Sequence, residues 1–443
     1  MMPITLLSSF LVGYAFTPLL ERVDHNIVPT QALITQETEQ AAASFQLLQT
    51  FQPFGSHTAN QLNSVTDGLC YIPASIANIA LSMDNQYLAV GGHSHNLERH
   101  CAGDGSQLTL WNLQTGEKIA HLIEDGWTYN DPPGTIPLAN EVDVIVGERA
   151  TGFVFLPESS ILVASLADST VRLWHPETGA SLGEWPGHTM SVWAIAASSD
   201  GRTVATGSAD QTIRVRTINP TTGAILDEQV LQETASVQHL RLSDDGQTLV
   251  SILGATLTDT TVHLWRQEHG VWQRVSWEQV FPWEDPSSDR LFATEYHPTV
   301  APRIQLSPDG NTVITGHLDG IIRLWDSASG VRQLSLENHQ GPIRSLAVSP
   351  DSQFLASNAD GVIKLWNLAT GQLIRTIETS GEPSFSMNGQ ILIVQQHDQA
   401  ELWNWRSPTL LSTLDSSDVT LNADNTLALS SRNETLEVWY CCQ

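Results

Sequence analysis

Lysine is almost missing from this chain of 443 residues, which contains only Lys118 and Lys364. Lysine and arginine together number 20, against 48 aspartate and glutamate residues, so the formal net charge is −28. Proteins that bind DNA or RNA neutralise phosphates with clustered cationic side chains. The sequence has no such cluster, so we expect neither a nucleic-acid partner nor attachment to an anionic membrane. A basic protein partner fits the charge, and so does an acidic surface that is simply well solvated.

The sequence also lacks an apolar run long enough for a transmembrane helix, which needs about 20 residues. The best candidate, Ile4 to Leu20, is short, and no integral membrane domain is expected. Within it, Ile4 to Val12 is typical of a signal-peptide apolar region, and Gly13-Tyr14-Ala15 of its cleavage site, but no cation precedes them. Export and a cytoplasmic location therefore both stay open. We expect a signal-like start and polar linker over residues 1–43 and one domain over 44–443.

Cysteine occurs only four times, and two copies, Cys441 and Cys442, are adjacent near the end of the sequence. Cys70 and Cys101 lie in long segments that separate apolar strands, and three histidines accompany Cys101, namely His93, His95 and His100. Their spacing matches no zinc pattern, so we expect no metal and no cofactor. A Cys70–Cys101 disulfide, two free thiols and a metal site are the three alternatives that the residue types leave open.

Against these absences stands a repeated pattern, clearest in Val313 to Asp326, which is read as VITGHLDGIIRLWD. Two runs of alternating apolar residues flank an Asp-Gly turn, which indicates a β-hairpin. The pattern returns as LASNADGVIKLWN at Leu355 to Asn367. From Trp325 to Trp366 is a step of 41 residues, within the period of about 40–45 residues expected for a four-stranded propeller blade.

These motifs resemble the WD-repeat β-propeller family. The corresponding tryptophans are Trp111, Trp174, Trp265, Trp325, Trp366, Trp403 and Trp439, and Arg216 stands where one more is expected. The resemblance implies an all-β fold with eight four-stranded antiparallel blades, or seven as the alternative count. The last unit has only three strands, so the resemblance also implies that Phe45 to Phe51 completes it and closes the ring.

The family also implies a buried hydrogen-bonded set of His, Ser or Thr, Asp and Trp in each blade. Two full sets fit the spacing: His297, Thr315, Asp319 and Trp325; His339, Ser357, Asp360 and Trp366. A third set, His188, Thr206 and Asp210, has Arg216 in place of the tryptophan. We interpret these residues as structural, because the repeat itself explains their presence.

Four segments exceed the blade length: 52–75, 91–106, 123–149 and 276–300. The resemblance puts them on one face, where long loops on a rigid scaffold commonly bind partners. Two of them supply the aromatic side chains that we predict as partner anchors: Trp127, Tyr129, Trp277, Phe281, Trp283, Phe292 and Tyr296. The same rings could instead pack the loops onto the propeller.

No phosphate-binding loop, nucleophile elbow or paired-carboxylate motif is present in the sequence. We therefore expect no enzymatic activity and predict a scaffold that binds other proteins on the face with the insertions. Two alternatives remain, a propeller enzyme with a site at the mouth of the central channel and a structural module of a larger assembly.

Overall fold

The computed structural model divides the chain into two compact units, Met1–Ala41 and Ala42–Gln443. The structure describes parts of the second unit: residues 45–51, 75–93, 107–123, 150–254, 259–282, 303–416, 418–422, 424–432 and 435–441. The predicted signal-like start and the Cys70–Cys101 pair lie outside these ranges. Within them, no helix has the length and apolarity needed to cross a membrane.

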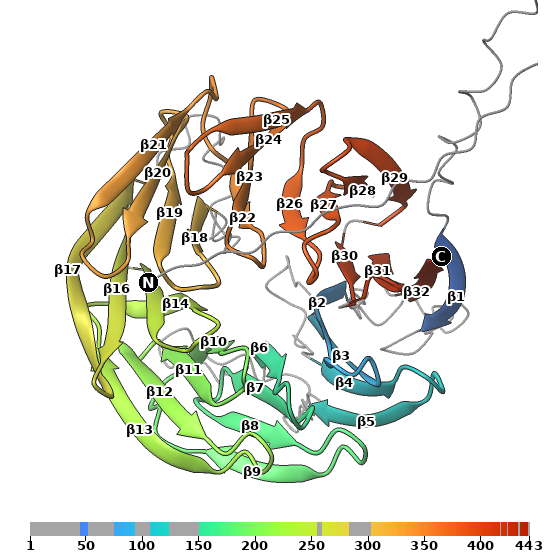
Figure 1. Ribbon diagram of the computed structural model, residues 1–443. Helices are drawn as coiled ribbons and strands as arrows, with labels where there is room; N and C mark the ends of the chain where they lie inside the picture. Colours follow the sequence, from blue (N-terminus) through green and yellow to red (C-terminus); the bar gives the residue numbers. More distant parts are fainter. Residues whose placement is uncertain are drawn as a thin grey trace, which may run out of the picture. The chain divides into compact units, whose positions relative to one another are not determined.

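The described residues form eight four-stranded antiparallel sheets, arranged as the blades of a propeller (Figure 1). Blade 1 contains β2 (Ser75–Leu81), β3 (Tyr87–His93), β4 (Gln107–Asn112) and β5 (Lys118–Ile123). Blade 2 contains β6 (Ala150–Phe155), β7 (Leu162–Leu166), β8 (Val171–Trp174) and β9 (Ser181–Trp185). Blade 3 contains β10 (Val192–Ala197), β11 (Thr203–Ser208), β12 (Thr212–Ile218) and β13 (Ile225–Gln232). Blade 4 contains β14 (Ser236–Leu242), β15 (Thr248–Gly254), β16 (Asp259–Glu268) and β17 (Val271–Pro282).

The second half of the ring repeats this order. Blade 5 contains β18 (Ile304–Leu306), β19 (Thr312–Gly316), β20 (Ile321–Asp326) and β21 (Arg332–Glu337). Blade 6 contains β22 (Ser345–Val348), β23 (Phe354–Ala359), β24 (Val362–Asn367) and β25 (Leu373–Ile377). Blade 7 contains β26 (Glu382–Phe385), β27 (Leu392–Gln395), β28 (Ala400–Asn404) and β29 (Thr409–Leu414). Blade 8 contains β30 (Asp418–Leu421), β31 (Leu427–Arg432), β32 (Thr435–Cys441) and β1 (Phe45–Phe51).

The turn between the first two strands of a blade shows why the repeat folds as it does. In blade 5 the Ser307 hydroxyl donates to Asp309 and accepts the Thr312 backbone N–H at 2.9 Å. Gly310 completes the turn with a φ of 70°, in the left-handed region that side chains disfavour. A Cβ there would also lie 2.8 Å from the Cβ of Ser243 in the neighbouring blade. The Ser-Pro-Asp-Gly motif therefore fixes both the hairpin and the close approach of two blades.

Blade 8 confirms the predicted ring closure. Its strand order is β1-β32-β31-β30, and Phe45 pairs with Cys441 in antiparallel register. The first and last blades then share one apolar cluster, in which Leu88 and Trp111 meet Leu429 and Val438. An N-terminal strand in the outer position joins the two ends of the described ring and covers the edge that a three-stranded blade would expose.

Strand direction separates two faces of the ring. Because every blade is antiparallel, the connections from its second to its third strand, and from its fourth strand to the next blade, leave at the same end. We call this end the insertion face, since four of the gaps between described strands begin and end there: Phe51 to Ser75, His93 to Gln107, Ile123 to Ala150, and Pro282 to Arg303. The turns between the first and second strands, such as Ser307 to Gly310, lie at the other end, which we call the turn face.

Candidate functional site

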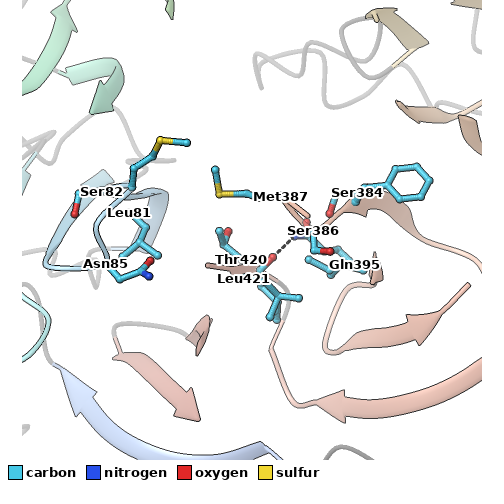
Figure 2. A pocket seen from close by; sticks show the side chains of 13 residues that line it. Leu81, Ser82, Asn85, Ser384, Ser386, Met387, Gln395, Thr420 and Leu421 are labelled. Carbon is cyan, nitrogen blue, oxygen red and sulfur yellow. Dashed lines mark hydrogen bonds between the residues drawn. The ribbon is translucent and has the colours of Figure 1, made fainter. Parts of the chain in front are cut away.

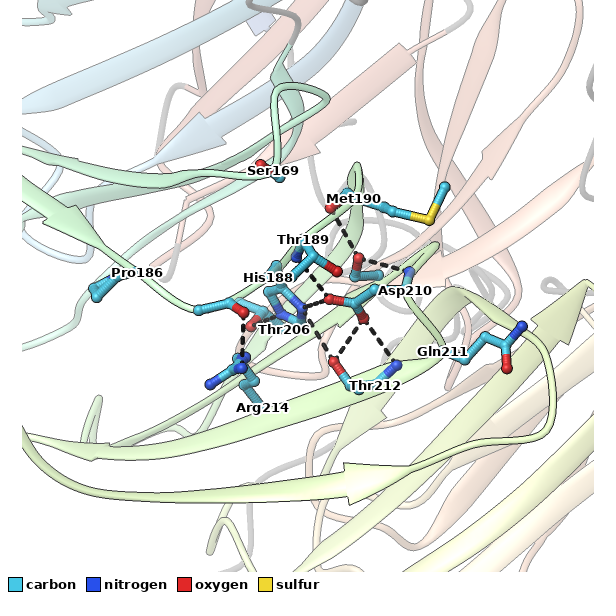
Figure 3. Close-up of polar contacts among 12 residues, drawn as sticks. Ser169, Pro186, His188, Thr189, Met190, Thr206, Asp210, Gln211, Thr212 and Arg214 are labelled. Carbon is cyan, nitrogen blue, oxygen red and sulfur yellow. Dashed lines mark hydrogen bonds and ion pairs between the residues drawn. The ribbon is translucent and has the colours of Figure 1, made fainter.

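The blade 3 set is the most complete of the predicted groups (Figure 3). His188 precedes β10, Thr206 lies on β11, and Asp210 lies in the turn before β12. His188 Nδ1 lies 2.9 Å from Asp210 Oδ2, and His188 Nε2 lies 2.9 Å from Thr206 Oγ1. The network therefore assigns the proton to Nδ1, which donates to the carboxylate, while Nε2 accepts the hydroxyl of Thr206.

Electrostatics keep this histidine neutral and its aspartate charged. Burial lowers the pKa of His188 and outweighs the opposite effect of Asp210. Burial alone would raise the pKa of Asp210, but hydrogen bonds from Thr212, the Thr189 backbone and His188 hold that pKa at about 2. The His188 side chain is only 1% exposed and both of its nitrogens are engaged. No substrate atom can reach it, so the triad-like arrangement serves the fold.

Arg216 makes the hydrogen bond to the second-strand hydroxyl that a tryptophan makes in blade 6. Its side chain is 0% exposed, and Nη1 donates to Thr206 Oγ1 at 3.0 Å. Nη2 donates to the Pro186 carbonyl at 3.0 Å and forms an ion pair with Glu228 at 2.9 Å. Burial lowers the pKa of Arg216 to about 10, and Glu228 limits that fall, so the guanidinium stays charged at neutral pH. The guanidinium also lies 5.5 Å from the ring centroid of Trp185, where it contributes a cation–π contact.

Blade 6 forms most of its predicted set. Ser357 Oγ lies 2.8 Å from His339 Nε2 and accepts the indole N–H of Trp366 at 2.8 Å. Asp360 accepts the backbone N–H groups of Gln340 and Gly341, whereas His339 Nδ1 has no hydrogen-bond partner among the described residues. The aspartate therefore holds the connection that carries the histidine rather than the histidine ring itself.

Blade 5 differs from the prediction. His297 lies outside the described residues, and Thr315 is instead 2.9 Å from His317 Nε2 and accepts the Trp325 indole N–H at 2.9 Å. The Asp319 side chain is 46% exposed and pairs with Arg323 at 2.6 Å. The prediction of a buried Asp319 carboxylate is wrong, because the turn that carries it directs the side chain toward solvent.

Blade 4 contains a buried acid that the sequence interpretation missed. Glu233 accepts hydrogen bonds from Ser251 Oγ at 2.5 Å and from the Trp265 indole at 2.8 Å, and lies 2.6 Å from His263 Nδ1. Burial raises the pKa of Glu233, but the three donors outweigh it and hold that pKa below its usual range. The missed signal is spacing: Glu233 precedes Ser243 by ten residues, as His188 precedes Ser198. Glu233 thus occupies the position of the blade histidine.

The predicted partner anchors divide into two groups. Trp277 lies on β17, is 5% exposed, and packs edge-on against Trp325 with ring centroids 5.8 Å apart. It forms part of the apolar cluster between blades 4 and 5, so its ring is not presented to solvent. Phe281 is on the same strand, but its side chain is not among those described. The other predicted anchors lie outside the described residues: Trp127, Tyr129, Trp283, Phe292 and Tyr296.

A cavity of about 350 Å³ opens on the turn face between blades 1, 7 and 8 (Figure 2). Its walls carry hydroxyl, amide and apolar groups, and no charged side chain lines it. Met83 and Met387 are each 50% exposed there, and Figure 2 shows Met387 reaching from blade 7 toward the space between the blades. The cavity itself therefore offers a neutral surface, unlike the acidic average of the chain.

Comparison with known proteins identifies the repeat. The family model "WD domain, G-beta repeat" matches residues 179–216, 299–326 and 330–367, which include β20 and β24 and most of β12. The WD repeat-containing protein VIP3 of Arabidopsis thaliana is 27% identical over 192 residues, 43% of this chain and 56% of that protein. Subunit I of eukaryotic translation initiation factor 3 is 24% identical over 177 residues in Debaryomyces hansenii, 40% of this chain and 47% of that protein.

The same subunit from Emericella nidulans is 26% identical over 209 residues, 46% of this chain and 58% of that protein. The chain thus spans about half the length of the curated relatives it matches. Among solved structures, the computationally designed protein Ika8 superposes with a TM-score of 0.55 at 23% identity, over 84% of this chain and 98% of that one. This likeness concerns the fold alone.

Proposed function

Because the chain is a WD-repeat β-propeller, we propose that it is a binding platform for a protein partner that docks on the insertion face. The observation that carries the proposal is the position of the four long connections, whose flanking strand ends all lie on that face. Long loops on a rigid scaffold supply binding surface without loss of the fold. Two of the matched relatives are by name subunits of a larger factor, which agrees with a role in protein assembly.

Side chains on the described part of the insertion face support the same proposal. Met190 lies in the connection between blades 2 and 3 and is 55% exposed (Figure 3). An exposed methionine adapts to the shape of an apolar partner at low energetic cost. The net charge of −28 favours a basic partner, whose encounter it would accelerate in a salt-dependent manner. Trp277 is excluded from the contact surface because it is buried, so Trp283 becomes the leading aromatic anchor.

The role we propose is not catalytic. The arrangement closest to a catalytic triad, in blade 3, is buried and its polar atoms are already paired. The remaining aspartates of the predicted sets are a solvent-exposed partner of Arg323 and an acceptor of backbone N–H groups. Neither position combines a nucleophile with a base.

Partner capture with the full chain tests the docking face. Met190→Ser and Trp283→Ser should each weaken capture from the native source while the melting temperature stays unchanged. Met387→Ser is the matched control, because Met387 is 50% exposed on the turn face. Capture that survives both insertion-face changes but is lost in Met387→Ser would transfer the docking site to the turn face.

A further inference from the structure

A second cavity, of about 210 Å³, lies at the centre of the propeller. Its walls come from the first strands of four successive blades, β2, β6, β10 and β14, which surround the central channel (Figure 1). Phe153 and Trp193 form aromatic parts of the wall, and His239 and Arg241 of β14 provide its ionisable groups. Arg241 is therefore the one permanently charged side chain among the residues that line the cavity.

Arg241 differs from several other arginines of the ring because no described carboxylate pairs with it. Its hydrogen bond stays within β14 and runs from Nη1 to the Leu240 carbonyl at 3.2 Å. By contrast, Arg172, Arg216 and Arg323 each form an ion pair with an acid of their own blade. Burial lowers the pKa of Arg241, and no acid among the described residues opposes that effect.

The Arg241 side chain is partly buried. A cation in such a position is unfavourable without a counter-charge, because it loses part of its hydration and gains no ion pair in return. The chain has 48 acidic residues, so the lack of one beside Arg241 in the described part of the ring does not reflect a shortage. Costly local arrangements of this kind occur where a ligand supplies what the protein leaves out. What the described part of the protein leaves out beside Arg241 is a negatively charged group.

The rest of the cavity suits an anion. Burial, together with Arg241, lowers the pKa of His239 to about 4, so at neutral pH this ring is uncharged and can donate one N–H. Strands β6, β10 and β14 are each hydrogen-bonded on one side only, so the other edge of each strand retains backbone N–H groups that no strand satisfies. Backbone N–H groups of this kind bind anions.

We propose that this channel cavity binds a small oxyanion, a carboxylate or a phosphate group, through a two-pronged contact with the Arg241 guanidinium. The planar guanidinium group can donate two parallel N–H hydrogen bonds to a carboxylate or to a phosphate group. A cavity of 210 Å³ is smaller than the roughly 300–1,000 Å³ typical of drug-sized ligands, so a single oxyanion fits better than a nucleotide. The oxyanion can be free in solution or carried on an acidic side chain.

Thermal unfolding of the full chain tests the proposal at constant ionic strength, with chloride as the reference anion. Inorganic phosphate represents the free anion, and N-acetyl-aspartate amide represents an acidic side chain. One or both should raise the melting temperature of the wild-type chain, because a ligand that binds only the folded state stabilises it. Arg241→Gln should weaken the affinity at least tenfold. In chloride, the same change should raise the melting temperature, since it removes the unpaired cation.

Two further variants separate a contact with Arg241 from a general effect of charge. Arg332→Gln removes an exposed arginine from β21 and should respond to both anions like the wild type. Arg241→Lys keeps the charge but loses the planar fork, and should bind with an affinity between the wild type and Arg241→Gln. A response to phosphate alone assigns the site to a free anion, and a response to the aspartate derivative assigns it to an acidic side chain. Equal responses of wild type and Arg241→Gln, or no response to either anion, would overturn the proposal.

Discussion

Arg216 in blade 3 and Arg241 in blade 4 are two arginines in the interior of the same propeller with opposite surroundings. Arg216 is fully enclosed and donates to Thr206, Glu228 and the Pro186 carbonyl. Arg241 borders a cavity and bonds only to a carbonyl of its own strand among the described residues. The comparison separates a fully buried cation, whose partners the fold supplies, from a partly buried cation, for which we propose an anionic ligand.

The closed networks show that the blades keep a balance of donors and acceptors rather than fixed residue types. In blade 6 a tryptophan donates to Ser357, whereas in blade 3 an arginine donates to Thr206. In blade 4 the histidine position holds Glu233, and a histidine from β16 supplies the donor. Each version pairs the hydroxyl or carboxylate at its centre, which is the condition for burying such groups.

Breaking the blade 4 network should have the largest effect. Glu233→Gln removes a 0% exposed charge and turns an amide toward donors that need an acceptor. We expect a loss of about 3–5 kcal/mol in the free energy of unfolding, measured by urea denaturation. The exposed Glu268→Gln is the control and should change little. A loss below about 1 kcal/mol would mean that the network tolerates a neutral acceptor.

Glu228→Gln should make Arg216 resemble Arg241, since it leaves the guanidinium without its counter-charge. The Glu228 side chain is 29% exposed, so water replaces part of the lost interaction. We therefore expect a smaller loss of about 2–3 kcal/mol in urea denaturation. Arg216→Trp in the same background restores the usual blade residue and should recover stability. No recovery would show that blade 3 has become specific for arginine.

The two aspartates of the predicted sets provide the next comparison. Asp360→Ala strands the backbone N–H groups of Gln340 and Gly341 and should cost about 1–3 kcal/mol. Asp319→Ala breaks only a solvent-exposed pair with Arg323 and should cost about 0–1 kcal/mol. Equilibrium unfolding of both variants measures the difference. The reverse order would restore Asp319 to the buried role that the sequence predicted.

Acid pH should reveal a smaller effect, which Arg241 exerts through its neighbour His239. The pKa values of His239, His317 and His339 are lowered to about 4. A histidine whose pKa is depressed by folding takes up its proton first in the unfolded chain, so stability is lost as pH falls from about 6.5 to about 4. Arg241→Gln removes one cause of the His239 shift.

We therefore expect Arg241→Gln to lose less stability between pH 7 and pH 5 than the wild type, by under about 1 kcal/mol. Melting temperatures at the two pH values measure the difference, with Arg332→Gln as the matched loss of one charge. An unchanged pH dependence in Arg241→Gln would show that Arg241 does not act on His239.

The sequence was most informative where a residue type has one physical reason to recur. Alternating apolar residues, the Ser-Pro-Asp-Gly turn at Ser307 to Gly310 and the 41-residue step from Trp325 to Trp366 predict the blades, because hairpin geometry depends on local chemistry. The incomplete last unit predicts that Phe45 to Phe51 closes the ring, since an uncovered sheet edge is unfavourable. Trp277 was misjudged as an anchor because a tryptophan near a long loop has the same pattern whether it packs inward or outward.

The sequence by itself therefore determined the repeated hairpins and the acidic charge, and its resemblance to a repeat family predicted the propeller and the strand that closes the ring, with eight or seven blades. Only the tertiary structure decided which polar residues are paired. Glu233 and His263 are 30 positions apart, yet they meet in one buried network. Arg241 lies at a cavity whose walls come from strands of four different blades, and none of the lining residues is an acid. Local patterns fix local hydrogen bonds, whereas the partner of a buried charge depends on which strands the ring brings together.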